Sequence, residues 1–343
     1  MANDSQVEQL AQLVESAQSI VVIQADNPDA DSLASALALE QILGDKGKQV
    51  YLYCGVDLPS YLRYLPGSDR VTSELPNNFD LSIIVDTSSN NLLQQLDRSG
   101  GKPWVTARPS VVIDHHSTEP TIKFAKLLYV RPAVATAEII YELAHQLDWP
   151  LNQQAKNLIA IAILSDSLGL MSSSTTARSI RIIAELVESG VDLPEIENAR
   201  RETMRRAPEL VHYKGRLLQR VEFYNDNRIA MVTVPWEEIE KYSPLYNPPM
   251  LVLDDMRLAS GTQIAIALKV YQDGKVTAKI RCNFGYAIAG KLAEHFGGGG
   301  HPYAAGFKII DGRSYEQLKN EIIKVTTQLL DEQKKGGLKS EAL

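Results

Sequence analysis

The first half of the chain alternates short, β-branched apolar segments with helical segments. Leu and Ala recur at helical spacing in "DSLASALALEQIL", whereas "SIVVIQ" and "DLSIIVD" are short and apolar. The predicted strands are 19–24, 48–54, 80–86 and 109–114, and the predicted helices are 31–43, 136–147, 152–166 and 174–190. This alternation favours an α/β fold, a doubly wound and mostly parallel sheet with helices on both faces, over residues 1–190. We interpret Thr136 as the cap of its helix.

The second half of the chain has a different pattern. Residues 191–222 are charged and helix-prone, which predicts a helical linker. Residues 223–331 predict a smaller α+β domain. Its expected elements are a strand at 228–234, two strands within 262–282 around the turn signal "QDGK", and helices at 286–296 and 314–330. We expect the glycine-rich segment 297–307 to be a loop without regular structure and residues 332–343 to be a frayed tail.

Charge and composition exclude several classes of protein. The 343 residues suggest two domains, and the formal net charge of −7 argues against a protein that coats long nucleic acids. A short anionic substrate at one local positive site stays compatible with that charge. The sequence has neither an apolar run of roughly 20 residues nor a signal peptide at its N-terminus. Cys54 and Cys282 lack metal-type spacing. We therefore expect a cytoplasmic protein without a membrane segment.

Acidic residues follow the apolar segments of the first half repeatedly. Asp29 and Asp31 follow "SIVVIQ", Asp86 follows "LSIIV", the triplet 114–116 follows "SVVI", and Asp166 follows "LIAIAILS". In an open parallel sheet, ligands bind outside the carboxyl ends of the strands. Four separate segments would thus bring carboxylate or imidazole groups to one edge of the sheet.

Each of these residues also has a structural alternative. Asp29 and Asp31 can each cap the helix that begins beside them, and Asp86 in "VDTSS" can form a turn with the hydroxyl groups that follow. The convergence of four segments, together with an imidazole pair, favours a functional site over separate structural roles. Mg²⁺ and Mn²⁺ bind carboxylate oxygens, and Mn²⁺ also accepts imidazole. Two such ions can hold both the attacking and the leaving oxygen of a displacement at phosphorus.

Five segments in order resemble the motifs of a known family. "NPDAD", "VDTSS", "DHH" and "SDSLGL" resemble the four motifs of the DHH phosphoesterases, and "GGGGHPYAAGF" resembles the glycine-rich motif of the DHH-associated domain. The resemblance extends over almost the whole chain. Size and layout are most similar to the bacterial nanoRNase and 3′-phosphoadenosine 5′-phosphate phosphatase group.

The resemblance implies a role for each matching residue. Asp29 binds the first Mn²⁺ ion, Asp31 binds the second, and Asp86 bridges both. His115 and Asp166 also bind the second ion. The resemblance further implies a substrate-facing His116, which contacts the phosphate as a donor or general acid, and an Asp114 that orients the imidazoles.

The chain departs from the family pattern at one position. The family usually has a metal-binding His four residues before the first Asp of its first motif, and that position is Ala25 here, between Gln24 and Asp26. Fewer protein ligands would then hold the first ion. This departure bears on the affinity for the metal, the choice between Mn²⁺ and Mg²⁺, and the catalytic rate.

The glycine-rich motif implies a nucleotide-binding segment in the second domain. Consecutive glycines let the backbone approach an anion closely, although a glycine after a helix is also a common C-terminal cap. By resemblance, His301 and the glycines hold the terminal phosphate or nucleotide, and Arg281 clamps the substrate phosphate. Asn283 either assists or is a turn residue. The substrate-binding set is Arg281, Asn283, Gly298, Gly299, Gly300 and His301.

The expected function is a Mn²⁺-dependent phosphoesterase with two ions that hydrolyses very short oligonucleotides to mononucleotides. Removal of a phosphate from 3′-phosphoadenosine 5′-phosphate is a second expected activity. One alternative is a soluble cyclic or linear dinucleotide phosphodiesterase. The other is a catalytically weak nucleotide-binding protein, which stays open because Ala25 replaces the usual metal-binding His. Family members are often homodimers, so a dimer is compatible with the resemblance.

Overall fold

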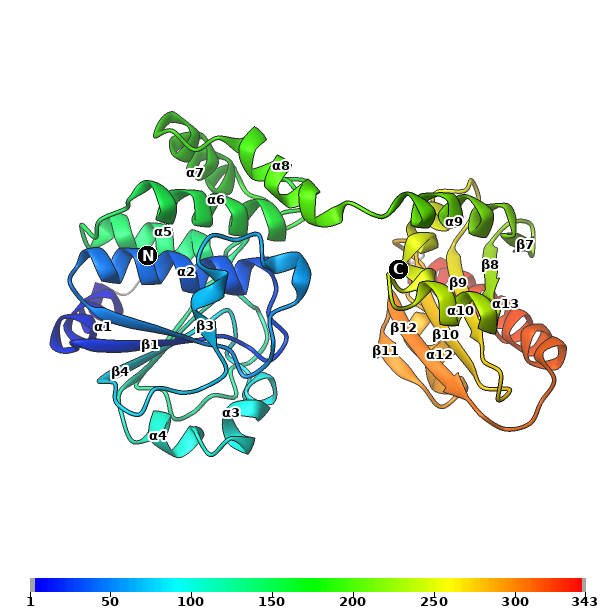
Figure 1. Cartoon of the computed structure of the whole chain (residues 1–343), viewed down its shortest axis with the longest axis horizontal. Coiled ribbons are helices and arrows are strands. Elements are labelled where there is room, and N and C mark those ends of the chain that lie inside the picture. Colours follow the sequence, from blue (N-terminus) through cyan, green and yellow to red (C-terminus); the bar gives the residue numbers. More distant parts are fainter. Residues whose placement is uncertain (1–3, 341–343) are drawn as a thin grey trace. The chain divides into compact units, whose positions relative to one another are not determined.

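A computed structural model of the chain describes residues 4–340, with side chains for 5–334. The chain folds into two compact units, one up to Arg205 and the other from Arg206 (Figure 1). Each unit has its own sheet and its own apolar core. The described part contains no helix that is both long and apolar enough to span a membrane.

The first unit is built on a six-stranded sheet in which every pair of neighbouring strands is parallel. The strand order is β3-β2-β1-β4-β5-β6. In chain order the strands are β1 (Ser19–Ile23), β2 (Gln49–Tyr53), β3 (Val71–Thr72), β4 (Leu81–Val85), β5 (Ser110–Asp114) and β6 (Leu127–Val130). The three central strands β1, β4 and β5 are almost entirely buried because helices cover both faces of the sheet, as expected for a parallel sheet.

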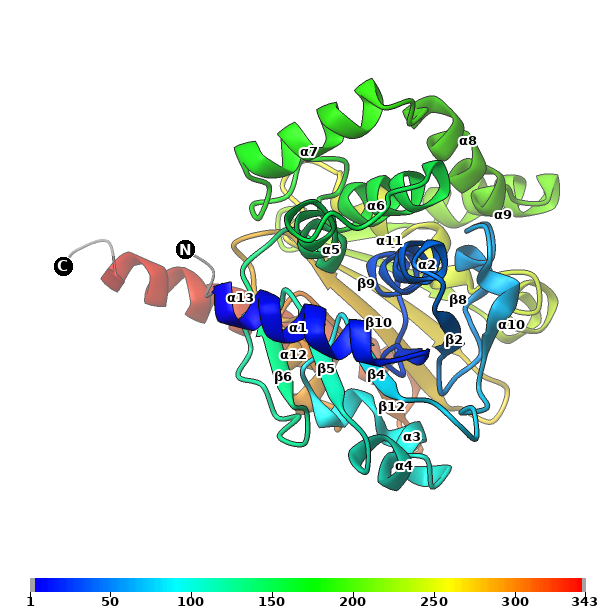
Figure 2. The same ribbon diagram turned by 90° about the vertical axis from the view of Figure 1, so that its left-hand side faces the viewer.

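Two layers of helices enclose this sheet (Figure 1, Figure 2). The larger core lies on one face and the smaller on the other. The first core takes side chains from α1 (Asp4–Ser16), α2 (Ala30–Asp45), α5 (Thr136–Gln146), α6 (Gln153–Asp166) and α7 (Ala177–Glu188). The second takes side chains from α3 (Gln94–Arg98) and α4 (Lys102–Thr106). The predicted doubly wound α/β fold is confirmed, and the sheet is wholly parallel.

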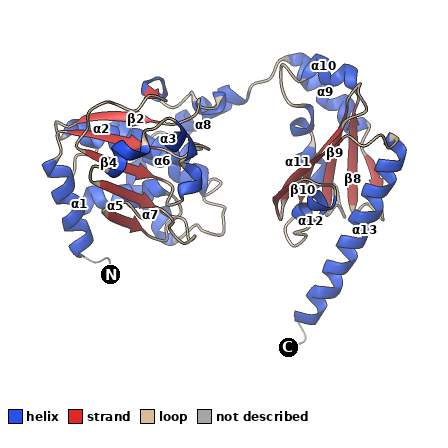
Figure 3. Ribbon diagram, turned by 90° about the horizontal axis from the view of Figure 1, so that it is seen from below, coloured by secondary structure: helices blue, strands red, loops and turns tan. Residues whose placement is uncertain are grey.

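The second unit contains a mixed six-stranded sheet in the order β11-β12-β10-β9-β8-β7 (Figure 3). Only β8 and β9 pair in parallel. In chain order the strands are β7 (Glu222–Tyr224), β8 (Ile229–Val234), β9 (Ile264–Val270), β10 (Val276–Cys282), β11 (Gly299–His301) and β12 (Ala304–Ile309).

Helices also lie on both faces of the second sheet. One core contains side chains of α12 (Ala289–His295) and α13 (Tyr315–Ser340). The other contains side chains of α9 (Pro208–Gln219), α10 (Trp236–Tyr242) and α11 (Leu253–Arg257). The short 3-10 helices in the described residues 4–340 are η1 (Ser60–Leu62), η2 (Ser68–Arg70), η3 (Asn90–Leu92) and η4 (Pro248–Leu251).

The glycine-rich segment is regular structure, so the prediction of a loop over 297–307 is wrong. Its first part forms β11, which pairs antiparallel with β12. A Cβ on Gly300 would lie 2.6 Å from the Cα of Ala305, closer than real Cβ atoms approach. A glycine at position 300 therefore allows β11 to pair with β12, although a run of four glycines by itself predicts a loop without regular structure.

Two further boundaries differ from the predicted ones. The segment predicted as a linker contains α8 (Leu193–Met204) in the first unit and α9 in the second, because Leu210, Tyr213 and Leu217 of α9 pack into a core of the second sheet. Helix α13 continues to Ser340 instead of ending near residue 330. The predicted tail also includes residues 341–343, which lie outside the described part of the chain.

Candidate metal centre

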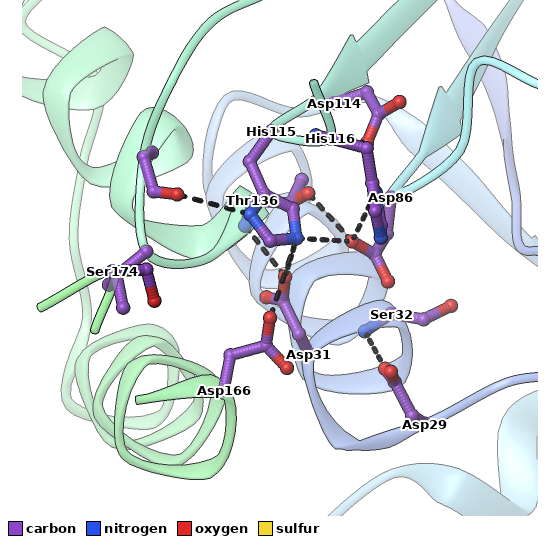
Figure 4. Close-up of polar contacts among 12 residues, drawn as sticks. Asp29, Asp31, Ser32, Asp86, Asp114, His115, His116, Thr136, Asp166 and Ser174 are labelled. Atoms are coloured by element: carbon purple, nitrogen blue, oxygen red, sulfur yellow. Dashed lines mark hydrogen bonds and ion pairs between the residues drawn. The ribbon is translucent and has the colours of Figure 1, made fainter. Parts of the chain in front are cut away.

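Acidic and imidazole side chains gather at the carboxyl ends of β1, β4 and β5 (Figure 4). Asp86 follows β4, Asp114 ends β5, and His115 and His116 come directly after it. Asp31 lies in the first turn of α2. Asp166 is the last residue of α6, and a carboxylate at a helix C-terminus opposes the helix dipole. A functional role explains such a placement better than helix stability does.

His115 lies at the centre of three carboxylates. Its Nε2 is 3.4 Å from Asp86 Oδ1, 3.4 Å from Asp166 Oδ2 and 3.8 Å from Asp31 Oδ2. On the other side of the ring, Nδ1 donates a hydrogen bond of 3.2 Å to the carbonyl oxygen of Ala133. That bond sets the tautomer and leaves the lone pair of Nε2 directed at the carboxylates.

Asp31 is held by the N-terminus of a helix more than a hundred residues away in sequence. Its Oδ2 accepts 2.6 Å from the backbone N–H of Thr136, and its Oδ1 accepts 3.2 Å from that of Ala137. Ser35 Oγ donates a further bond of 2.9 Å to Oδ1. These two backbone groups belong to the first turn of α5, whose N-cap Ala135 offers no side-chain acceptor. Asp31 therefore caps α5 from a distance.

The interpretation of Thr136 as a helix cap is wrong. Thr136 is the first helical residue of α5, and its Oγ1 donates a bond of 2.9 Å to Asp86 Oδ1. Sequence reasoning missed this functional contact because Thr before a helix is the usual capping pattern. Asp86 itself has a left-handed backbone with φ of 61°, a conformation that few non-glycine residues adopt. Strained backbone of this kind is concentrated at functional sites.

His116 is paired with the buried Asp114. The Nδ1 of His116 donates to Asp114 Oδ1 over 2.7 Å, and the backbone N–H of His116 donates to the same oxygen over 3.2 Å. The side chain of His116 is half exposed, whereas that of Asp114 is fully buried. The geometry leaves Nε2 of His116 available to a ligand.

Asp29 caps α2, which is the structural role predicted as its alternative to metal binding. Its Oδ1 accepts 3.0 Å from the backbone N–H of Ser32, which caps α2. The carboxylate is nevertheless close to the cluster (Figure 4): burial is the main cause of the raised pKa of Asp86 and of Asp166, and the charge of Asp29 adds to both. It belongs to neither of the two compact ligand groups described below.

The pKa shifts show that this cluster concentrates negative charge at a buried point. Burial, followed by the charge of Asp86, raises the pKa of Asp31 to about 7. Burial and the nearby Asp31 raise the pKa of Asp166 to about 6, and burial also raises that of Asp86. Burial opposes a charged His115, yet Asp86 and Asp31 raise its pKa to about 9. The carboxylates thus lack a compensating charge when the imidazole is neutral.

The donor set fits divalent cations. One potential ligand group contains Asp86, His115 and His116, and the other contains Asp31, His115 and Asp166, with the donor atoms of each within 4.8 Å of one another. His115 Nε2 is buried and forms no hydrogen bond of ordinary geometry among the described residues, and its nearest carboxylate oxygens lie 3.4 Å away. A buried polar atom without a good hydrogen bond needs an explanation, and a cation bound there would supply one. Oxygen and imidazole ligands suit Mn²⁺ and Mg²⁺.

Ala25, which stands where the family usually has a metal-binding histidine, is buried among other residues of the first unit. Ala25 is only 4% exposed, and its carbonyl oxygen accepts from Cys54 Sγ at 3.6 Å. The neighbouring Gln24 is fully buried, and neither amide atom has a partner among the described residues. Asp26 is used structurally, because its Oδ2 accepts 2.8 Å from the backbone N–H of Gln95.

The predicted substrate-binding residues lie at one end of the second sheet. Arg281 of β10 and His301 of β11 both pair with Ala304 of β12. Asn283 is structural, since its side-chain amide donates 2.8 Å to the carbonyl oxygens of Arg257 and Thr262. Gly298, Gly299 and Gly300 belong to the β11 hairpin or its approach.

Comparison with protein families identifies both units. Residues 19–165 match the DHH family, N-terminal domain, and residues 251–332 match the DHHA1 domain. The chain belongs to the DHH phosphoesterases. As a DHH phosphoesterase it is a metal-dependent hydrolase.

Two relatives of this DHH phosphoesterase match 89% of the chain each. The chain is 27% identical over 311 residues to an A-adding tRNA nucleotidyltransferase of Aquifex aeolicus; the match covers 89% of the chain but only 34% of that protein. It is 26% identical over 313 residues to the bifunctional oligoribonuclease and PAP phosphatase NrnA of Thermus thermophilus, with 89% and 88% covered.

A solved structure shares the fold of this DHH phosphoesterase over nearly its full length. It is an exopolyphosphatase-related protein from Bacteroides fragilis, with a TM-score of 0.77 and 19% identity, and the match covers 96% of this chain and 98% of that one. At this identity the likeness concerns the fold.

Proposed function

We propose that this protein is a cytoplasmic, Mn²⁺-dependent phosphoesterase that hydrolyses very short oligonucleotides to mononucleotides and removes a phosphate from 3′-phosphoadenosine 5′-phosphate. Similarity to an oligoribonuclease and PAP phosphatase over most of both chains supports the substrate class. One observation carries the proposal: the buried Nε2 of His115 lies 3.4 to 3.8 Å from three carboxylates of three separate elements and forms no hydrogen bond of ordinary geometry among the described residues. Such a donor set is built for cations rather than for fold stability.

The residues divide into ligands and residues that position them. We assign Asp31, Asp86, His115 and Asp166 as ligands of two ions. Asp29 would complete the first ion through Oδ2, because the cap of α2 uses its Oδ1. Thr136 orients Asp31 and Asp86, and Ala133 orients His115. Bound divalent cations would supply positive charge against the charge that develops on the phosphoryl oxygens.

His116 and Arg281 are the proposed contacts to the substrate. Nε2 of His116 is free to donate to a phosphoryl oxygen or to protonate the leaving oxygen, while Asp114 holds the ring through Nδ1. Arg281 forms no ion pair with a carboxylate in the described part of the chain, and its guanidinium donates a hydrogen bond to the carbonyl oxygen of Ile280. Its guanidinium is thus available for a phosphate.

A substrate screen tests the proposal. The purified protein, with Mn²⁺ added, would be given a dinucleotide, a long oligonucleotide, 3′-phosphoadenosine 5′-phosphate, a cyclic dinucleotide and pyrophosphate. We expect rapid release of mononucleotides from the dinucleotide and little cleavage of the long oligonucleotide. Preferred cleavage of the cyclic dinucleotide or of pyrophosphate would overturn the substrate assignment.

Asp86→Asn tests the metal centre directly. The change keeps the size of the side chain but removes the charge, so we expect turnover to fall by about a thousandfold or more. Asp57→Asn, which alters an exposed carboxylate outside the cluster, should retain full activity. Full Mn²⁺-dependent hydrolysis by Asp86→Asn would refute the assignment. A wild-type protein that binds nucleotides but cleaves none of the substrates would instead be a catalytically weak nucleotide-binding protein.

A further inference from the structure

The most exposed large apolar side chain of the described residues is an aromatic ring in the second unit. Phe284 is 94% exposed and lies in the turn that follows β10. A phenyl ring left in water forgoes the free energy that its burial would contribute. A single exposed apolar side chain is ordinary on a protein surface, so the significance of this ring depends on what lies beside it.

Tyr303 presents a second ring parallel to the first. The two ring centroids are 6.3 Å apart and the planes differ by only 6°. Two rings in direct face contact would hide much of each other, yet Phe284 keeps 94% of its surface exposed. Tyr303 therefore covers little of the Phe284 ring, which leaves that ring open to a ligand. A flat ring held between two others needs about 7 Å between their planes, twice the roughly 3.5 Å of close carbon contact, so the exposed Phe284 would rotate to admit one.

The aromatic pair lies at the same end of the sheet as the predicted phosphate-binding residues. Tyr303 is in the turn between β11 and β12, two residues after His301, and its carbonyl oxygen accepts 2.9 Å from the backbone N–H of Cys282. Phe284 is two residues beyond Cys282, and Arg281 is one residue before it. Both rings are thus tied to the strand end that carries Arg281.

The sheet face beside Arg281 is basic and has little side-chain bulk. Paired residues of neighbouring antiparallel strands share a face, so Arg281, Ala304 and His301 form one row across β10, β12 and β11. Lys279, Gly306 and Gly299 form the next row. In the described part of the chain, neither Arg281 nor Lys279 has an ion pair. Small residues between free cations leave room for an anionic ligand.

We infer that Phe284 and Tyr303 form a stacking clamp for one nucleobase, while Arg281 and His301 receive the phosphate of the same nucleotide. The inference rests on the proposed function, because it names how that function would recognise its substrate. Every base has an aromatic face, so the clamp would accept all four bases and favour the larger purines. Recognition by stacking suits an enzyme that degrades short oligonucleotides of any sequence.

Binding of a fluorescent nucleotide tests the clamp without catalysis. The monophosphate of 2-aminopurine riboside, whose emission is quenched on stacking, would be titrated into the full chain in the presence of EDTA. We expect quenching with wild type, and a dissociation constant raised roughly tenfold in Phe284→Ala and in Tyr303→Ala. Phe284→Tyr and Tyr303→Phe, which keep a ring, should bind like wild type. Trp104→Ala, which removes an exposed ring of the first unit, is the matched control.

Several outcomes would overturn the clamp. Unchanged nucleotide affinity in both alanine variants would do so. Wild-type affinity in Phe284→Leu would also do so, because it would show that apolar contact is sufficient without stacking. Sedimentation that reveals a dimer dissociated by Phe284→Ala, with unchanged affinity for the nucleotide, would assign the ring to self-association. Binding measured without metal separates the clamp from the catalytic proposal: a clamp that binds while the enzyme cleaves nothing refutes only the proposed hydrolysis.

In active protein, Phe284→Ala should raise KM for a dinucleotide and leave kcat unchanged.

Discussion

At the scale of single residues, Thr136 connects two of the candidate ligands. Its backbone N–H donates to Asp31 and its hydroxyl donates to Asp86. Carboxylates that repel each other would otherwise turn apart, and these donors hold them close to His115. Groups that orient metal ligands commonly change metal affinity or activity by ten- to a hundredfold when removed.

Thr136→Val isolates the contribution of the hydroxyl. Valine keeps the shape and the backbone N–H, so that only the bond to Asp86 is lost. We expect Mn²⁺ affinity or turnover to fall by about tenfold, with little change in helix content. Calorimetric titration with Mn²⁺ and the hydrolysis rate would measure this. Thr136→Ser restores the hydroxyl and should recover most of the loss; a valine variant equal to wild type would contradict the positioning role.

At the scale of elements, the glycines before β12 differ in whether backbone conformation or packing requires a residue without a Cβ. Gly297 follows α12 with φ of 73°, which is typical of a helix C-terminus. Gly300 has φ of 142° and is pressed against the backbone of β12. Gly299 has open space where a Cβ would be and no positive φ. Of these three glycines, only Gly299 lacks a structural reason, which makes it the candidate for close approach to a ligand.

Gly300→Ala and Gly299→Ala separate structure from binding. The Cβ of Gly300→Ala would lie 2.7 Å from the carbonyl oxygen of Ala304, so the hairpin must shift. We expect a loss of about 2 kcal/mol in the free energy of unfolding. Gly299→Ala should stay within about 0.5 kcal/mol of wild type but weaken nucleotide binding. Urea unfolding and the nucleotide titration give both quantities; equal stability of the two variants would refute the packing argument.

At the scale of the whole molecule, the two units have separate cores and separate sheets. The candidate metal ligands all belong to the first unit, and the predicted substrate-binding residues Arg281 and His301 belong to the second. Ligands of the two kinds should therefore stabilise different parts of the chain.

Calorimetric unfolding of the intact chain would show this division. We expect two transitions in EDTA, and Mn²⁺ should raise the transition temperature of only one. At a free Mn²⁺ concentration of 100 Kd, the stabilisation should be about 2.7 kcal/mol. Asp86→Asn should lose the shift and so identify the transition of the first unit. A single transition, or equal shifts of both, would contradict the independence of the units.

The sequence by itself determined the parallel α/β domain and the identity of the polar residues at its edge. Strands such as β4 and helices such as α2 follow from apolar patterns within a few residues, so local sequence carries the information. The carboxyl ends of parallel strands meet at one edge, which is why Asp31, Asp86 and His115 were expected to lie together. Their short mutual distances agree with that expectation.

Only the tertiary structure decided which groups hold those residues in place. The bonds from Thr136 to Asp31 and Asp86 and from His115 to Ala133 join segments far apart in the chain, and no local pattern specifies such partners. The β11 hairpin likewise depends on the backbone of β12, against which Gly300 packs. Local propensity describes how a segment can fold alone; long-range packing selects the partner that satisfies its remaining polar groups.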